Sequence, residues 1–388
     1  MVAFPPPAQT HSPPAGAILT IDLAALVANW RHLGQASGAR QCAAVVKADA
    51  YGLGARAVVS ALADAGCRAF FVAHLDEALA IADLIPANGW VAVLNGLMPG
   101  AEGIAAANGV LPVLNSLAQA RRWQAEAHSR GRALPALLQV DSGMSRLGLC
   151  AEDAAVLARD ADFRAKVPLL AIMSHLACAD DPSDPANPAQ LRAFSEMAAL
   201  FPGVARSIAN SGGCLMGAEY GCDLARPGLA LYGAQPATTP DLSLRPVVRL
   251  DARVIQIRQV PAGAGAGYGL TWHAAAPARL ATLAIGYADG WLRSLSGRGA
   301  AAWGGHELPI AGRVSMDSTI VDITALPENS LQEGDFVELI GPHRAIEQVA
   351  GEAGTIPYEI LTGMGVRLAR HYLDAGQNRT ISAVETAA

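Results

Sequence analysis

Residues 42–52 read Cys-Ala-Ala-Val-Val-Lys-Ala-Asp-Ala-Tyr-Gly, a short apolar run that ends on Lys47. The chain has 28 basic residues and only two are lysines, so 26 are arginines. An arginine could replace a lysine whose task is to be positive, but its guanidinium stays protonated and cannot bond covalently to an aldehyde. A lysine at the end of a buried strand is partly desolvated, which lowers its pKa and frees the amine. Lys47 is therefore a candidate nucleophile, and the structural alternative is a snorkelling lysine at a strand end.

Apolar runs of this kind recur along the first part of the chain. They predict strands at 42–47, 69–72, 91–94, 110–114, 136–141, 169–173, 206–209 and 228–232. Between them Ala and Leu recur at helical spacing in 54–65, 75–85, 116–129, 151–161 and 188–200. Ser116 and Asp22 suit the starts of helices. This alternation over residues 17–245 predicts the α/β class and a (β/α)8 TIM-like barrel, with a doubly wound sheet as the alternative.

The pattern of apolar residues changes after Pro246. Runs rich in Val, Ile and Leu, broken by Gly, Pro or Asp, lie at 247–260, 279–287, 308–323 and 335–340. They predict a separate, mainly β C-terminal domain over 246–388. Three prolines make 236–246 a reasonable linker, and five prolines make 1–16 a disordered tail.

Composition excludes several classes of function. The net charge is −6 and the sequence has no basic cluster, which argues against nucleic acid or an anionic membrane as partner. Six scattered cysteines and no paired histidines predict no metal site and fit reduced thiols in the cytoplasm. We see no secretion signal and no span suited to a bilayer. Residues 263–269 are glycine-rich but lack the G-x-G-x-x-G spacing, and neither a P-loop nor a G-x-S-x-G elbow is present.

Three further polar segments come just after predicted strands and a fourth lies at the eighth predicted strand, where a barrel places its chemistry. They are 141–148 with Arg146, 174–180 with His175 and Asp180, Asn210-Ser211-Gly-Gly, and 226–232 with Arg226. The segment Asn210-Ser211-Gly-Gly suits a phosphate, since it combines a hydroxyl, permissive glycine backbone and a possible helix N-terminus. A lysine and a phosphate cradle without a nucleotide motif indicate pyridoxal phosphate.

Six motifs in register resemble the alanine racemase family. They are Ala-Val-Val-Lys-Ala-Asp-Ala-Tyr-Gly at 44–52, Asp-Ser-Gly-Met-Ser-Arg-Leu-Gly at 141–148, Arg-Pro-Gly-Leu-Ala-Leu-Tyr-Gly at 226–233, Ala-Ile-Gly-Tyr-Ala-Asp-Gly at 284–290, Gly-Arg-Val-Ser-Met-Asp at 312–317 and Thr-Ile-Pro-Tyr-Glu-Ile at 355–360. The resemblance implies interconversion of L- and D-alanine, D-alanine for peptidoglycan, and a homodimer that shares its active sites.

The same resemblance implies roles for individual residues. Lys47 would hold the cofactor and act as one proton-transfer base, and Tyr268 of the partner subunit would be the other. The cofactor would contact Tyr51, Asn210, Ser211, Tyr358, the backbone of Gly228 and Leu229, and Arg226 supported by His175. Arg146 and the backbone of Met316 would bind the substrate. A substrate corridor would be lined by Asp180, Tyr287, Arg293, Arg313 and Ile356.

The implied chemistry has a physical rationale. Racemisation removes the α-proton from one face and returns a proton to the other, which favours two bases on opposite sides. Arg226 is a poor proton donor, so a pyridine nitrogen facing it should stay unprotonated. Arg146 offers a fork that matches a carboxylate.

The chain departs from the family pattern at Gln139. Many alanine racemases have a lysine there that becomes carbamylated and braces the substrate-binding arginine. We expect Arg146 to be positioned by the Gln139 amide or another acceptor, and bicarbonate to leave activity unchanged.

Three alternatives remain open at this point. The substrate could be serine, lysine or a broader set, because a methylene or two changes binding by only about 1–3 kcal/mol. The chain could be a decarboxylase of the same fold, although such enzymes use a cysteine where Tyr268 stands. It could also be a non-catalytic cofactor carrier, but those resemble the barrel alone.

Overall fold

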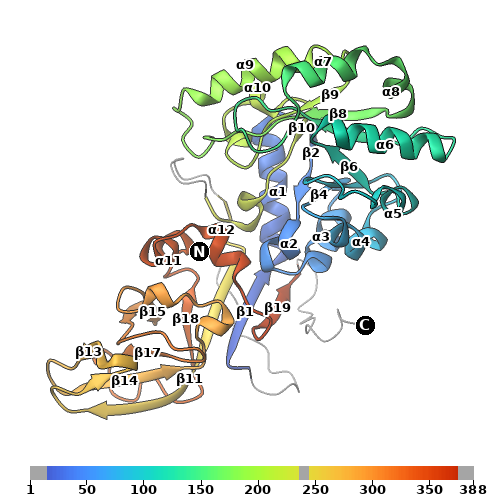
Figure 1. Ribbon diagram of the computed structural model, residues 1–388. Helices are drawn as coiled ribbons and strands as arrows, with labels where there is room; N and C mark the ends of the chain where they lie inside the picture. Colours follow the sequence, from blue (N-terminus) through green and yellow to red (C-terminus); the bar gives the residue numbers. More distant parts are fainter. Residues whose placement is uncertain (1–14, 236–243, 375–388) are drawn as a thin grey trace. The chain divides into compact units, whose positions relative to one another are not determined.

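The computed structural model describes residues 15–235 and 244–374 (Figure 1). The chain divides into two compact units: Leu26–Arg245, and Met1–Ala25 together with Pro246–Ala388. We call them the barrel unit and the C-terminal unit, and each is described by itself. The predicted tail, apart from residues 15 and 16, and most of the predicted linker lie outside the described residues.

Seven short parallel strands form the main sheet of the barrel unit. In spatial order they are β3 (Ala44–Val45), β4 (Ala69–Val72), β5 (Trp90–Val93), β6 (Leu111–Leu114), β7 (Ala136–Gln139), β8 (Leu169–Met173) and β9 (Ala205–Ser207). Most of their residues are buried. Continuous apolar runs are what parallel strands covered on both faces require, so these predictions from the sequence are confirmed.

An eighth strand closes the sheet into a ring. β10 (Leu224–Ala225) pairs in parallel with β2 (Gln41–Cys42), which precedes β3. Ala43 donates its N–H to the Ala225 carbonyl at 2.8 Å, and the Arg226 N–H reaches the Ala209 carbonyl at 3.0 Å. β10 thus bonds to the first strand on one side and to the β9 segment on the other. The closed ring confirms the TIM-like barrel over the doubly wound sheet.

The prediction of an eighth strand at 228–232 is wrong. Leu229–Tyr232 forms a 3₁₀ helix, η3, and the strand is β10, which ends before Arg226. Pro227 has no N–H to give to a ladder, and the Gly228 N–H is taken by the Ser211 hydroxyl at 2.9 Å. The apolar residues of 228–232 are buried because they pack as a helical turn.

Helices connect successive strands of the barrel unit (Figure 1). Ser116 accepts the Gln119 N–H at 3.2 Å, and Asp22 accepts the Ala25 N–H at 2.8 Å, which confirms both predicted helix starts. The helical segments are α1 (Leu23–Ser37), α2 (Lys47–Gly52), α3 (Ala55–Asp64), α4 (Leu75–Ile81), η1 (Ala82–Leu84), α5 (Glu102–Ala107), α6 (Leu117–Ser129), α7 (Ala151–Arg159), α8 (Ala161–Lys166), α9 (Ala186–Ala198), η2 (Gly213–Leu215) and α10 (Ala218–Gly221).

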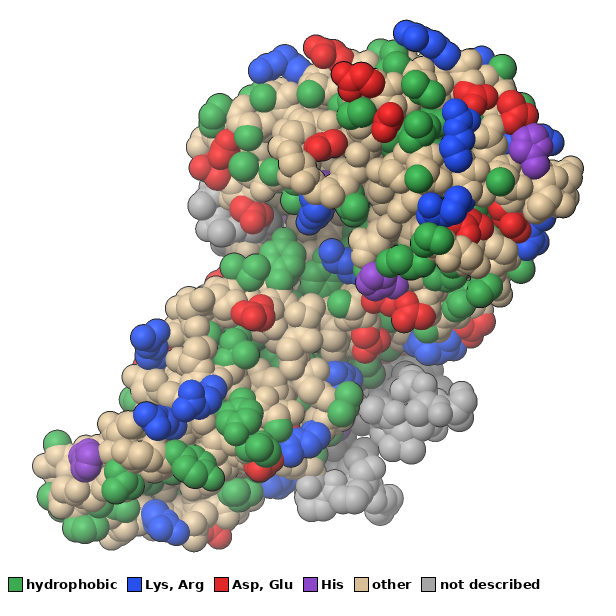
Figure 2. Space-filling model, viewed as in Figure 1, with side chains coloured by type: hydrophobic (Ala, Val, Ile, Leu, Met, Phe, Trp, Pro, Cys, Tyr) green, Lys and Arg blue, Asp and Glu red, His purple; other side chains and the backbone are tan. Residues whose placement is uncertain are grey.

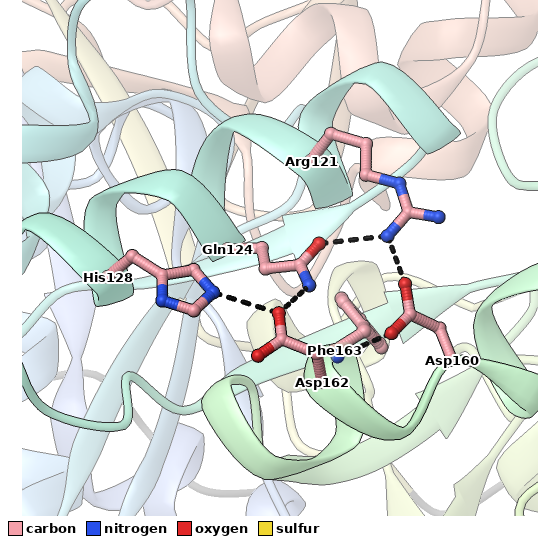
Figure 3. Close-up of polar contacts among 6 residues, drawn as sticks. All are labelled: Arg121, Gln124, His128, Asp160, Asp162 and Phe163. Carbon is pink, nitrogen blue, oxygen red and sulfur yellow. Dashed lines mark hydrogen bonds and ion pairs between the residues drawn. The ribbon is translucent and has the colours of Figure 1, made fainter.

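A polar cluster joins α6 to α8 on the outside of the barrel unit (Figure 3). Arg121 of α6 forms an ion pair with Asp160, which precedes α8, and donates to the side-chain amide oxygen of Gln124 at 2.9 Å. The Gln124 amide and the His128 ring both contact the Asp162 carboxylate, the ring at 2.8 Å. We call these five residues the α6–α8 cluster. They connect two helices whose backbone is regular.

The C-terminal unit is built around the 13-residue strand β11 (Val248–Val260). Register shifts at 250/251 and 254/256 let its first half pair with β18 (Phe336–Ile340) and its second half with β14 (Ala278–Leu283). The remaining elements are β12 (Gly265–Ala266), η4 (Tyr268–Leu270), β13 (Trp272–His273), η5 (Tyr287–Asp289), η6 (Arg293–Leu295), β15 (Ala300–Trp303), β16 (His306–Pro309), β17 (Thr319–Asp322), α11 (Ile346–Ala353), α12 (Pro357–Thr362) and β19 (Ala369–Leu373). The mainly β domain expected from the sequence is confirmed.

One strand of this unit comes from the other end of the chain. β1 (Ala17–Asp22) pairs antiparallel with β11 and parallel with β19. The expectation that the barrel begins at residue 17 is therefore wrong, because 17–22 belongs to the C-terminal sheet. Its apolar side chains are buried there, and nothing local in a six-residue strand encodes which distant strand it will pair with.

Figure 2 shows one face of the molecule, on which acidic and basic side chains are interspersed with hydrophobic ones. Within the described ranges, no helix combines the length and apolar character needed to cross a bilayer.

Candidate active site

Lys47 lies directly after the first barrel strand. The preceding residue, Val46, donates its N–H to the Phe71 carbonyl of β4 at 2.8 Å, so the strand is fixed up to the lysine. Lys47 is half-buried. Burial lowers the pKa of its amine, the positive charge of Arg146 lowers it further, and the carboxylate of Glu77 opposes them. The site therefore favours the neutral amine more than bulk water does.

The chain turns left-handed immediately after Lys47. Ala48, Asp49 and Ala50 each have φ 53° and ψ 50°, and Tyr51 has φ 58° and ψ 38°. This conformation costs L-residues about 1–2 kcal/mol each, so four in succession need support from their surroundings. Sequence reasoning missed this turn, because no glycine occupies the strained positions to signal it.

Arg226 is buried at the end of β10, with 3% of its surface exposed. Its guanidinium donates to the Ser174 carbonyl at 2.6 Å and to the Ser207 hydroxyl. Among the described residues it forms no ion pair with a carboxylate. Burial lowers the pKa of Arg226 to about 10, which still leaves it charged at neutral pH. Ser207 thus supports Arg226, a role that the sequence did not assign to it.

His175 lies beside three cations. Burial lowers its pKa to about 3, with further lowering by Arg226, Arg146 and Lys47. The ring is therefore neutral at working pH. The structure thus brings Lys47, Arg146, His175 and Arg226 within electrostatic reach of one another at the carboxyl ends of the strands.

Arg146 is exposed on a loop that Asp141 shapes. The Asp141 carboxylate accepts the N–H groups of residues 143, 144 and 145 at 2.9–3.1 Å. Gln139 donates its amide to the Leu147 carbonyl at 3.2 Å, so its bond goes to the loop backbone and not to the Arg146 guanidinium. The described residues therefore show no hydrogen bond between the Gln139 amide and the Arg146 guanidinium.

Hydroxyl and amide groups converge near the start of η3. The Ser211 hydroxyl accepts the N–H groups of Gly228 at 2.9 Å and Ala230 at 3.2 Å. A methyl group added to Gly228 would stand 2.3 Å from the Tyr51 hydroxyl, so this hydroxyl lies against the glycine backbone. The Tyr51 ring packs on Tyr232 with centroids 4.7 Å apart. Leu229 is buried in the same turn.

Asn210 and Asp180 are placed on neighbouring loops. Asn210 accepts the Gly213 N–H at 3.0 Å and donates to the Leu176 carbonyl at 3.2 Å, so it shapes the loop. Asp180 is exposed in the loop after β8. Lys166, the second lysine, is the last residue of α8 and is half-buried.

The remaining predicted site residues belong to the C-terminal unit, and many are exposed. Tyr268 is 72% exposed, and the same loop leaves Leu270 exposed as well. Gly269 lies against the Arg313 guanidinium, since an added Cβ would stand 3.0 Å from Nη1. The other exposed positions are Tyr287, Arg293, Arg313, Met316 and Ile356, while Tyr358 on α12 is half-buried.

Arg367 connects two of these loops. Its guanidinium pairs with Asp289 and with Asp317, each at 2.7 Å. Asp289 closes the loop that carries Tyr287, and Asp317 follows Met316. The same loops are joined by backbone bonds, including the Ala288 N–H to the Met316 carbonyl at 3.0 Å. Sequence reasoning missed Arg367, because its partners lie 50 and 78 positions away in the chain.

Comparisons with known proteins agree with this arrangement. The chain matches the alanine racemase N-terminal domain over residues 21–236 and the alanine racemase C-terminal domain over 247–372. It is 51% identical over 360 residues to "Alanine racemase, catabolic" of Agrobacterium fabrum, covering 93% of each chain. It is 50% identical over 372 residues to alanine racemase of Brucella canis, covering 92% of this chain and 94% of that one.

Solved structures give the same result. A structure of alanine racemase from Bartonella henselae with covalently bound pyridoxal phosphate has a TM-score of 0.89 and 45% identity, covering 93% of this chain and 100% of that one. Biosynthetic alanine racemase from Pseudomonas aeruginosa has a TM-score of 0.85 and 36% identity, covering 93% and 100%. The chain belongs to the alanine racemase family.

Proposed function

We propose that this enzyme interconverts L-alanine and D-alanine, with Lys47 and Tyr268 of the partner subunit as the two proton-transfer bases. The observation that carries the proposal is the placement of Lys47. It is a half-buried lysine at the carboxyl end of a barrel strand, with a lowered pKa and with Arg146, His175 and Arg226 nearby. Family membership makes alanine the first substrate to test.

The barrel unit offers a set of groups that fits pyridoxal phosphate. The Tyr51 and Ser211 hydroxyls and the backbone at Gly228 converge where a phosphate could be bound. The buried guanidinium of Arg226 suits the ring nitrogen, and the Lys47 amine suits the aldehyde. When bound, this cofactor withdraws electrons from the α-carbon of an amino acid and so makes its proton removable. The family resemblance implies that Asn210, and Tyr358 of a C-terminal unit, would also contact the cofactor.

The lowered pKa of Lys47 gives the amine its proposed role as a base on one face of the substrate. A neutral amine can accept the α-proton, and the resulting ammonium can return one. Arg146 is proposed to bind the substrate carboxylate, with the Met316 backbone as a second contact. The neutral His175 adds no further positive charge beside the guanidinium of Arg226.

The second base is proposed to come from a partner subunit. Tyr268, Leu270, Met316 and Ile356 expose 72%, 55%, 53% and 57% of their surface within a single chain. Exposed large apolar side chains of this kind mark surfaces that another surface covers. We therefore expect a homodimer in which each C-terminal unit completes the other subunit's site. Tyr287, Arg293, Arg313 and Ile356 of the C-terminal unit, together with Asp180 of the barrel unit, are proposed to line the substrate corridor.

The product is proposed to be D-alanine for peptidoglycan, made in the cytoplasm. All six cysteines are free, which suits a reducing compartment. The relatives bear both "catabolic" and "biosynthetic" in their names, so breakdown of D-alanine is the alternative direction of use.

The test is to incubate the purified holoenzyme with L-alanine in D₂O and follow both enantiomers. Two bases predict D-alanine that carries solvent deuterium at Cα from the first turnovers, while the remaining L-alanine keeps its protium. Direct return of the original proton would contradict the two-base assignment. A panel with serine and lysine, and a measurement of released carbon dioxide, would identify a different substrate or a decarboxylase.

A further inference from the structure

Glu77 of α4 reaches back along the sequence to the turn that follows Lys47. Its Oε1 accepts the Ala48 N–H at 2.6 Å. Its Oε2 accepts the N–H groups of Ala73 at 2.7 Å and His74 at 3.1 Å. A single half-buried carboxylate thus ends β4, caps α4 and contacts a segment 29 residues earlier in the chain.

The contact falls on the first peptide group of the left-handed turn. The Ala48 amide is bonded to the Lys47 carbonyl carbon, so holding this amide fixes the orientation of the peptide plane beside the lysine. The far end of the turn is held by Asp49, whose carboxylate accepts the Ala55 N–H at 2.7 Å. With both bonds in place, residues 48–51 keep a conformation that isolated L-residues avoid.

We propose that Glu77 is a positioning residue for Lys47: its carboxylate fixes the strained turn and thereby the direction in which the lysine amine leaves the strand. The inference rests on the proposed function in one respect, that Lys47 is the residue that holds the cofactor. A capping residue of α4 would need the bonds to Ala73 and His74 alone. The bond to Ala48 exceeds that need.

The charge of Glu77 acts on the same amine. Three charged or titratable groups face Lys47 from separate segments: Arg146 after β7, His175 after β8, and Glu77 on α4. Arg146 lowers the pKa of Lys47 and Glu77 raises it. Loss of the Glu77 charge should therefore let the amine lose its proton at a lower pH.

The experiment measures capture of pyridoxal 5′-phosphate by the full-length protein after its cofactor has been removed. Capture joins the lysine nitrogen to the aldehyde carbon and releases one water, and it needs the neutral amine. The rate, followed by visible absorbance against pH, rises through the pKa of the amine to a plateau. The midpoint reports the charge around Lys47, and the plateau reports the geometry of the turn.

Glu77→Gln should change both quantities. The midpoint should fall to lower pH, because a neighbouring negative charge is lost. The plateau should fall several-fold, because an amide presents an NH₂ group to one set of backbone donors. Asp76→Asn is the matched control, since Asp76 carries the same charge in the same first turn of α4 but is exposed. It should leave both quantities unchanged.

Glu77→Asp separates the two effects and also covers the case in which Glu77→Gln fails to fold. It keeps the charge but shortens the reach by one methylene, so the midpoint should stay and the plateau should fall. If Glu77→Gln or Glu77→Asp gave the wild-type plateau, the positioning role would be overturned. A wild-type protein that captures the cofactor at a site other than Lys47 would instead overturn the proposed function.

Discussion

The surroundings of Lys47 and the α6–α8 cluster use the same chemistry to different ends. In both, carboxylates just before or within the first turn of a short helix accept backbone N–H groups: Glu77 at α4, and Asp160 at α8, where it accepts the Phe163 N–H at 2.9 Å. The α6–α8 cluster joins two regular helices on an exposed surface (Figure 3). Glu77 instead supports a strained turn beside a candidate nucleophile. A polar contact therefore bears on function when the backbone it holds would not adopt that conformation alone.

The largest expected effect comes from Lys47→Arg. The variant keeps a positive charge but has no amine that can become neutral, so racemase activity should fall at least about 10³-fold and the visible absorbance of the holoenzyme should vanish. Lys166→Arg is the matched control and should retain both. A Lys47→Arg protein that keeps both its activity and its visible absorbance would contradict the assignment of Lys47 as the residue that holds the cofactor.

Arg367→Gln tests whether an ion-pair network in the C-terminal unit also supports irregular backbone near predicted site residues. Arg367 also holds irregular backbone, so its loss should loosen the loops of Tyr287 and Met316 and raise KM for alanine by about 3–10-fold with a smaller change in kcat. Asp317→Asn removes the exposed half of the contact and should have the smaller effect. If steady-state kinetics gave an unchanged KM for Arg367→Gln and Asp317→Asn, Arg367 would have no role in holding these loops for substrate binding.

Asp162→Asn tests whether the α6–α8 cluster contributes to stability alone. His128 and Gln124 hold the pKa of the Asp162 carboxyl below its usual range. The charge therefore stabilises the fold above the unfolded-state pKa, and this contribution is lost as pH falls through the lowered folded-state pKa. We expect Tm to fall by about 2 °C or less at neutral pH, with kcat/KM unchanged. A clear loss of activity would show that the α6–α8 cluster is not merely stabilising.

The smallest expected effect is none at all. Gln139 cannot form a carbamate, and its amide holds the Leu147 carbonyl. Adding bicarbonate, or removing it by degassing, should leave the racemase rate unchanged. A rate that rises with bicarbonate would show that another amine braces Arg146.

The parts of the fold that could be predicted are those with local signals. Apolar runs predicted seven barrel strands, and Asp22 and Ser116 predicted helix starts, because strand burial and capping act within a few residues. The eighth strand was misplaced because the burial of 228–232 in a 3₁₀ turn looks the same in a sequence as burial in a strand. The pairing of β1 with β11 joins segments more than 200 residues apart, which no local pattern encodes.

Some residues of the candidate site could likewise be found from local sequence signals, and others could not. Lys47 and the segments after the strands could be found because each follows an apolar run. The roles of Tyr268, Tyr358 and Met316 came from the family resemblance alone and stay predictions. Glu77 and Arg367 were missed, since their importance comes from distant partners, Ala48 for one and Asp289 with Asp317 for the other.

The most direct test is to reduce the holoenzyme with borohydride and locate the modified residue by peptide mass mapping. With two lysines in the chain the assignment is nearly binary. We expect one pyridoxyl group per subunit, on the peptide that contains Lys47. A label on Lys166, or no label on either lysine, would contradict it.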